Sequence, residues 1–324
     1  MFRTELSPKP SSHKIQLSNP LISIGSCFAD NIGKKLSQHK FKVEYNPFGI
    51  IFNPLSIFEL IEMALDETRL PEDSYLVRDG IHLNYKVHSE LYGKSQEQLE
   101  SHINRQRNRL TKVLKKPTTI IITLGTAWVY EEKKTQILVA NCHKTPASQF
   151  NKRLLSSEEI SSAFMLLKEQ LHTQNPELKF ILTVSPIRHV KDTLELNMVS
   201  NSILRLACHQ ISTYADDVDY FPAYELLMDD LRDYRFYEKD MLHPNDLSQE
   251  YIWGKFMDVY FDKETKAFIK DWGEIRSAMK HKPFHPESDA HQKFLQKTIE
   301  KLEQLKGLVK VDKELVKLRK QLIG

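Results

Sequence analysis

The sequence has no long hydrophobic run and few cysteines. No stretch of about 18 consecutive apolar residues occurs among its 324 positions, so no segment is typical of a membrane-spanning helix. Residues 1–10 also lack the apolar core of a secretion signal. The three cysteines, Cys27, Cys142 and Cys208, form no close pair, which is typical of reduced thiols. We therefore expect a cytoplasmic protein without a membrane partner.

A strong excess of one charge is also missing. The chain has 46 Lys and Arg residues against 43 Asp and Glu, a net charge of +3, and the two signs are interspersed. This balance produces no long-range field suited to nucleic acid, so we expect no nucleic-acid partner. Hydrophobic residues make up 40% of the chain, enough for one large core or two modest ones.

The apolar residues switch between strand-like and helix-like spacing along the chain, which predicts an α/β fold. The expected strands cover residues 21–24, 118–124, 180–184 and 218–221. The expected helices cover residues 28–38, 54–65, 96–114, 157–172 and 195–214, and a further helix ends near Phe261. Residues 75–87 predict an inserted antiparallel hairpin that turns at Asp79-Gly80.

The character of the chain changes after about Lys280, where Pro283 and Pro286 indicate a linker. We therefore expect two domains, residues 1–280 and residues 281–324. Residues 288–322 predict one lysine-rich helix with apolar residues at helical spacing. This helix is expected to pack on the first domain or on a second subunit, so self-association is an expectation. The alternative is an arm for a membrane surface or a nucleic acid, which the interspersed glutamates disfavour.

Ser26 lies where a buried strand is expected to run into a helix. Gly25 permits backbone angles that a side chain forbids, and the first N–H groups of the following helix favour a negative oxygen beside the Ser26 hydroxyl. These features favour a nucleophilic serine. Taken alone, they also fit a serine that only caps a helix.

Asp240 and His243 lie three residues apart in a loop rich in turn-forming residues. Asp240 could accept a hydrogen bond from one ring nitrogen of His243 and hold the tautomer whose other nitrogen takes a proton from Ser26. The alternative is a surface loop in which Asp240 caps the next helix. The two motifs together favour a triad of Ser26, His243 and Asp240.

Five short segments resemble the GSCFA family. They are Gly25-Ser26-Cys27-Phe28-Ala29, Gly125-Thr126-Ala127-Trp128, Asn141-Cys142-His143-Lys144, Ser185-Pro186-Ile187-Arg188-His189 and the run from Asp240 to His243, and the likeness covers roughly residues 15–265. That family is grouped with the SGNH (GDSL-like) hydrolases. The resemblance implies a three-layer α/β/α fold with a mainly parallel sheet, serine ester chemistry, and no metal or organic cofactor.

The resemblance also implies an oxyanion hole. In SGNH hydrolases its donors are the N–H of the nucleophile, here Ser26, a glycine N–H and an asparagine side chain. Gly49 resembles the glycine, but Ala127 stands where the asparagine is expected. Losing one donor costs about 3 kcal/mol of transition-state stabilisation, so we expect Asn141 to replace it, with Thr126 and His143 as alternative donors. The alternative for Asn141 is a loop residue that hydrogen-bonds its own backbone.

Several polar residues follow the expected strands, where an open α/β sheet holds its ligand. Arg188 could bind a carboxylate or another anionic group of a substrate, or it could form a structural ion pair. The residues expected to bind substrate are Thr126, His143, Arg188 and His189.

The expected function is a serine-dependent ester hydrolase or acyltransferase. Its substrate would be a small-molecule or carbohydrate ester, with a sugar O-acetyl group suggested by analogy alone. A non-catalytic ligand-binding module on the same scaffold is one alternative, motivated by Ala127. The other is a zinc site of Cys27, Cys142, His143 and His243, which the adjacency of Cys142 and His143 disfavours.

Overall fold

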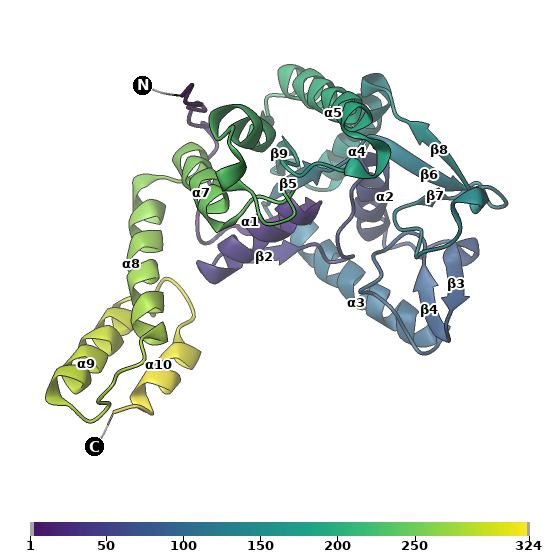
Figure 1. The fold of residues 1–324 in the computed structure, drawn as a ribbon. Coiled ribbons are helices and arrows are strands. Elements are labelled where there is room, and N and C mark those ends of the chain that lie inside the picture. Colours follow the sequence, from purple (N-terminus) through teal and green to yellow (C-terminus); the bar gives the residue numbers. More distant parts are fainter. Residues whose placement is uncertain (1–2, 323–324) are drawn as a thin grey trace.

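A five-stranded parallel sheet forms the centre of the computed structural model, which describes residues 3–322 (Figure 1). The strands lie in the order β10-β9-β5-β1-β2, and each pairs with its neighbour in parallel. Their bounds are Pro20–Gly25 for β1, Lys42–Tyr45 for β2, Thr119–Leu124 for β5, Lys179–Val184 for β9 and Val218–Tyr220 for β10. The predicted α/β fold with a mainly parallel sheet is thus confirmed.

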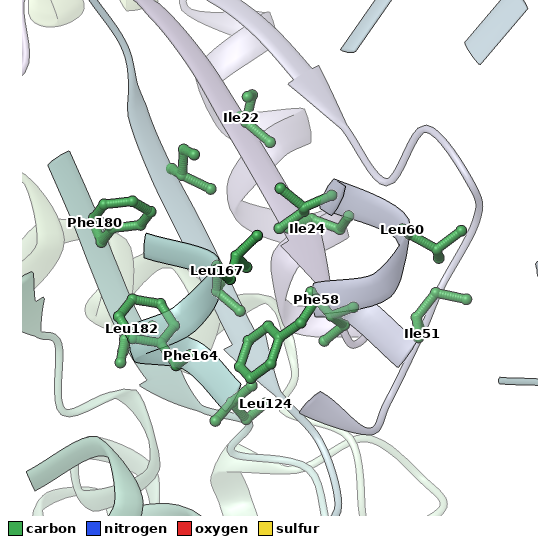
Figure 2. Packing of buried hydrophobic residues seen from close by; sticks show 14 of the residues in the cluster. Ile22, Ile24, Ile51, Phe58, Leu60, Leu124, Phe164, Leu167, Phe180 and Leu182 are labelled. Carbon is green, nitrogen blue, oxygen red and sulfur yellow. The ribbon is translucent and has the colours of Figure 1, made fainter. Parts of the chain in front are cut away.

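Strand β5 explains why helices cover both faces of this sheet. All six of its residues are buried. Ile120 and Ile122 belong to one hydrophobic cluster, whereas Ile121 between them belongs to another. Because alternate side chains of a strand point to opposite faces, the two clusters lie on opposite sides of the sheet. Figure 2 shows part of the first cluster, in which Phe58 and Phe164 pack edge to face beside the strands.

Each cluster is covered by its own helices. The first is covered by α2 (Pro54–Leu65), α3 (Gln96–Leu114), α4 (Ser157–Gln174) and α5 (Leu194–Tyr214). The second is covered by α1 (Cys27–Gln38), α7 (Asp246–Tyr260) and α8 (Lys263–Lys280). The chain also forms the short helix α6 (Ala223–Glu225) and several single helical turns. These turns are Glu72–Ser74, Ala147–Gln149, Val190–Asp192, Leu226–Asp230 and Tyr234–Phe236.

Two small antiparallel sheets accompany the central one. The predicted hairpin is confirmed as β3 (Tyr75–Arg78) and β4 (Ile81–Asn84), with Asp79 and Gly80 both at positive φ in its turn. The second sheet, in the order β7-β6-β8, was not predicted. It contains β6 (Trp128–Glu132), β7 (Leu138–Val139) and β8 (Phe150–Leu154).

The predicted single helix over residues 288–322 is wrong. The chain instead forms α9 (Asp289–Gln304) and α10 (Asp312–Arg319), which lie together beyond α8 (Figure 1). A turn after Gln304 reverses the direction of the chain. This reversal buries Leu302 of α9 and Leu315 of α10 in the same cluster, which a continuous helix would hold apart. Self-association through this region and the division at residue 280 stay predictions.

No helix within residues 3–322 is both long enough and apolar enough to span a bilayer. The cytoplasmic location stays a prediction.

Candidate functional site

Ser26 lies at the carboxyl end of β1 and directly before α1. Gly25 has φ +135°, and a Cβ there would lie 2.1 Å from the carbonyl oxygen of Thr123 on β5, so the turn requires glycine. Ser26 is the N-cap of α1, and its Oγ accepts a hydrogen bond from the N–H of Phe28 at 3.3 Å. The side chain is buried, with 1% of its surface exposed. The strand, turn and helix predicted around Ser26 are therefore present.

The order of the strands gives this turn a special position. From β1 the chain adds β2 on one side, whereas β5, β9 and β10 lie on the other side. The strand order therefore reverses between β1 and β5, and open α/β sheets bind ligands in the crevice outside such a point. Ser26 follows β1 and Gly125 follows β5, so both lie at this crevice.

Asp240 and His243 form the contact that their spacing predicted. Asp240 Oδ2 lies 2.6 Å from His243 Nδ1, and Oδ1 accepts the backbone N–H groups of Leu242 and His243. These two backbone hydrogen bonds, with the contact to the His243 ring, lower the pKa of Asp240 to about 2. Asp240 thus stays ionised at neutral pH and directs Nε2 of His243 away from itself. Both side chains are about half exposed.

His189 links this loop to the ends of the central strands. Its ring packs edge to face on Phe52 at 4.9 Å, and the Phe52 carbonyl accepts the N–H groups of Gly125 and Thr126. Burial lowers the pKa of His189, and the charge of His243 lowers it further. Arg188 and Leu242, the chain neighbours of His189 and His243, line one cavity, so the Asp240–His243 loop lies beside the segment that follows β9.

Among residues 3–322, no hydrogen bond joins Ser26 to His243. The Ser26 oxygen accepts from the N–H of Phe28, and within residues 3–322 its own hydrogen has no acceptor. His243 binds Asp240 through its ring and Glu238 through its carbonyl. The Asp240–His243 pair is thus assembled, whereas its connection to Ser26 is not made in this conformation.

The two predicted backbone donors of the oxyanion hole already have acceptors. The N–H of Ser26 donates to Thr123 O at 3.1 Å, and the N–H of Gly49 donates to Asn46 O at 2.9 Å. The first bond extends the pairing of β1 with β5, and the second closes a tight turn. An oxyanion could use these N–H groups only if both bonds opened.

Asn141, His143 and Thr126 are held by structural contacts. The Asn141 Oδ1 accepts the N–H of His143, and the buried His143 ring contacts Asn84 O at 2.8 Å and Ser89 Oγ at 3.0 Å. Thr126 Oγ1 contacts Ser200 Oγ at 3.2 Å and accepts the N–H of Trp128. These contacts fix the loops locally and attach Thr126 to α5, and within residues 3–322 none reaches Ser26, Asp240 or His243.

Asn46 is a site residue that the sequence analysis missed. It follows β2, and its Oδ1 accepts the N–H of Gly25 at 2.9 Å. Because an N–H can only donate, this bond fixes the orientation of the amide, and Nδ2 must point elsewhere. Nδ2 is buried and has no hydrogen-bond partner in the described part of the chain. Unpaired buried donors are rare, which makes this amide, held beside the residue that precedes Ser26, a candidate for a role at the site.

A cavity of about 330 Å³ lies beside the Asp240–His243 loop. The segment after β9 forms one wall with Arg188, and the chain from Met228 to Leu242 forms the other. Arg188 and Leu242 are the chain neighbours of His189 and His243. The cavity therefore opens next to the two histidines.

The four residues of the zinc alternative do not gather. Within residues 3–322, no group of three or more His, Cys, Asp or Glu side chains is arranged to hold a metal ion. His143 uses both ring nitrogens in contacts with Asn84 and Ser89, and His243 binds Asp240.

The comparisons with known proteins identify a family. A model described as "GSCFA family" matches residues 20–256, and one described as "GSCFA domain protein, C-terminal domain" matches residues 272–324. No curated protein matches the chain significantly. Because the first match spans well over half of the sequence, and includes both Ser26 and the Asp240–His243 pair, the chain belongs to the GSCFA family.

Proposed function

We propose that this protein is a serine-dependent ester hydrolase or acyltransferase in which Ser26 is the nucleophile. The observation that carries the proposal is the Asp240–His243 pair, whose loop shares a cavity with the segment after β9, a strand of the sheet whose β1 leads into the turn that presents Ser26. An ionised carboxylate that fixes the tautomer of a histidine is what a base for a serine requires. The resemblance to SGNH hydrolases supports the same roles.

The reaction requires the Asp240–His243 loop to approach Ser26. The His243 ring is half exposed in a segment of turns, so a shift of this loop can bring Nε2 to the Ser26 hydroxyl. His243 then takes the Ser26 proton as Oγ bonds to the ester carbonyl carbon. The leaving alcohol takes that proton from His243. Water or an acceptor hydroxyl then attacks the acyl carbon while His243 takes its proton, and Ser26 Oγ leaves with that proton.

Asn46 Nδ2 is the donor we propose for the oxyanion. The carbonyl oxygen of the ester gains negative charge during the attack, and a fixed, buried N–H that lacks an acceptor stabilises that charge. The Asn46 amide is held through Gly25, the residue before the nucleophile. It therefore supplies the side-chain amide that Ala127 lacks.

A non-catalytic ligand-binding module is the second candidate. It is favoured by the burial of Ser26 and by its capping bond to Phe28, both of which fit a structural serine. The substrate of the enzyme, a small-molecule or carbohydrate ester, stays part of the proposal, as does the choice between water and an acceptor hydroxyl.

The two candidates are separated by intact mass after incubation with a fluorophosphonate probe. We expect one adduct on the wild-type chain and on Ser95→Ala, and none on Ser26→Ala. Ser95 is the matched control because it caps α3 through the same kind of bond, to the N–H of Gln98 at 3.3 Å. An unlabelled wild type, under conditions that label a control esterase, would favour the binding module. Equal labelling of Ser26→Ala would place the nucleophile elsewhere.

A further inference from the structure

The arginine beside the two histidines has an unusual environment. Arg188 is half buried, and its only hydrogen bond within residues 3–322 runs from Nη2 to the sulfur of Met228 at 3.2 Å. No carboxylate lies within ion-pair distance of it in that part of the chain, whereas Arg153 and Arg205 each have a glutamate partner. The structural ion pair considered for Arg188 is therefore absent from the described residues.

A second donor converges on the same sulfur. The hydroxyl of Tyr237 donates to Met228 Sδ at 3.7 Å, from the opposite wall of the 330 Å³ cavity. A thioether is a weak acceptor, so neither donor is well satisfied. The positive charge of Arg188 acts on this hydroxyl as well, since it opposes the rise in the pKa of Tyr237 that burial causes. Two donors, one of them charged, thus share one weak acceptor at the cavity.

The other charged groups of the cavity keep it positive. Arg232 lines it and has no carboxylate partner within residues 3–322. Asp233 also lines it, but Arg235 binds its carboxylate at 2.8 Å, and this contact lowers the pKa of Asp233. The remaining wall is apolar or aromatic, with Leu194, Tyr234 and Met241.

We infer that this cavity binds a carboxylate or phosphate group carried by the substrate, with Arg188 and Tyr237 as its ligands. An oxyanion replaces the Met228 sulfur as acceptor and gains a charge-assisted bond from the guanidinium. The apolar and aromatic wall accommodates a ring or short chain attached to that group. The inference rests on the proposed function only in calling the ligand a substrate, since the cavity lies next to His189 and His243 and anion binding itself requires no catalysis.

The test is isothermal titration calorimetry of the full chain with benzoate, inorganic phosphate and benzamide. Benzamide matches benzoate in size and lacks its charge. We expect benzoate or phosphate to bind and benzamide to bind at least about tenfold more weakly, because a charge-assisted bond contributes that much or more. The anion that binds more tightly identifies the group.

Variants assign the binding to the cavity. Arg188→Gln is expected to weaken anion binding at least about tenfold, and Tyr237→Phe to weaken it less, because only a neutral donor is removed. Arg105→Gln is the matched control, since Arg105 is exposed on α3 and its loss changes the net charge equally.

If Arg188→Gln does not fold, the Tyr237→Phe titration decides. Absence of anion binding in the wild type, or unchanged binding in both cavity variants, would overturn the inference. Labelling the wild type with the fluorophosphonate probe separates the two proposals, because a wild-type chain that binds the anion but forms no adduct retains the cavity and rejects the enzyme.

Discussion

The two ends of the Asn46 amide group differ in their contacts. Its oxygen holds the N–H of Gly25, and its nitrogen is buried without a partner in the described residues. A buried donor without an acceptor lowers stability by about 1 to 3 kcal/mol, so the chain keeps this amide at a cost. The role proposed for it at Ser26 accounts for that cost.

Asn46→Asp tests this role directly. The substitution keeps an oxygen for the N–H of Gly25 but replaces the donor with a second, negatively charged oxygen. We expect the rate of fluorophosphonate labelling to fall at least about 10²-fold while the chain stays folded. Asn141→Asp is the comparison, because Asn141 is the donor that the sequence suggested. A fall in Asn141→Asp without a fall in Asn46→Asp would contradict the assignment to Asn46.

Some contacts of the site could be predicted from the sequence, and others could not. The contact of Asp240 with His243 lies within one turn, so the spacing of the two residues was enough to predict it. The contact of Asn46 with Gly25 joins two neighbouring strands, and no local pattern reports it. The Asn-Pro pair ahead of Gly49 was the available signal, but it was interpreted only for its glycine.

At the scale of elements, strands β1, β5, β9 and β10 and most helices around them were predictable because their apolar periodicity is strong, whereas the edge strand β2 and helix α8 were not predicted. The helix predicted over residues 54–65 is observed as Pro54–Leu65, with Asn53 as its N-cap. The sheet of β6, β7 and β8 was missed because its strands are short, and because β8 has the exposed polar residues Asn151 and Lys152. The turn between α9 and α10 was missed because its apolar residues keep a helical spacing across the break.

Helix α8 is attached to α1 by Trp272. The indole Nε1 donates to the carbonyl of Gln38 at 2.8 Å, the ring is 98% buried, and the ammonium group of Lys40 lies 4.8 Å from the ring centroid. We expect Trp272→Ala to lower the free energy of unfolding by about 3 to 5 kcal/mol through loss of this buried ring. Trp272→Phe should lose far less, because it keeps an aromatic ring in place.

Urea denaturation of both variants measures this effect. Phe284→Ala is the control, because that aromatic side chain is 99% exposed and its removal should leave the unfolding midpoint unchanged. Equal midpoints for Trp272→Ala and the wild type would contradict the proposed attachment of α8.

At the scale of the whole molecule, buried and partly buried histidines make the fold sensitive to acid. Burial is the largest cause that lowers the pKa of His13, His39, His143 and His189 below the ordinary value of 6.5. The unfolded chain therefore binds protons at a higher pH than the folded chain does. The contribution of these histidines to the free energy of unfolding is therefore complete at pH values above their ordinary pKa, and it is lost as the pH drops below that pKa.

Acidic groups extend the same trend to lower pH. Hydrogen bonds lower the pKa of Asp240 and Asp262 in the folded chain, so their contribution is present above the pKa of the unfolded carboxyl and is lost as these groups become protonated. We expect the thermal unfolding midpoint to fall between pH 7 and pH 5 and to fall again below about pH 4. Between pH 7 and pH 5, we expect the unfolding midpoint of His143→Gln to fall less than the midpoint of the exposed control His285→Gln. A midpoint that is constant or rises on acidification to pH 5 would contradict the neutral state of the buried histidines.

The central claim is that His243 activates Ser26. The most direct measurement is the second-order rate constant for fluorophosphonate labelling, compared between the wild type and His243→Ala, with His285→Ala as the control for loss of an exposed histidine. Removing a general base typically lowers such a rate by about 10²- to 10⁴-fold, and we predict a fall in that range for His243→Ala and no change for His285→Ala. A His243→Ala chain labelled as fast as the wild type would contradict the account.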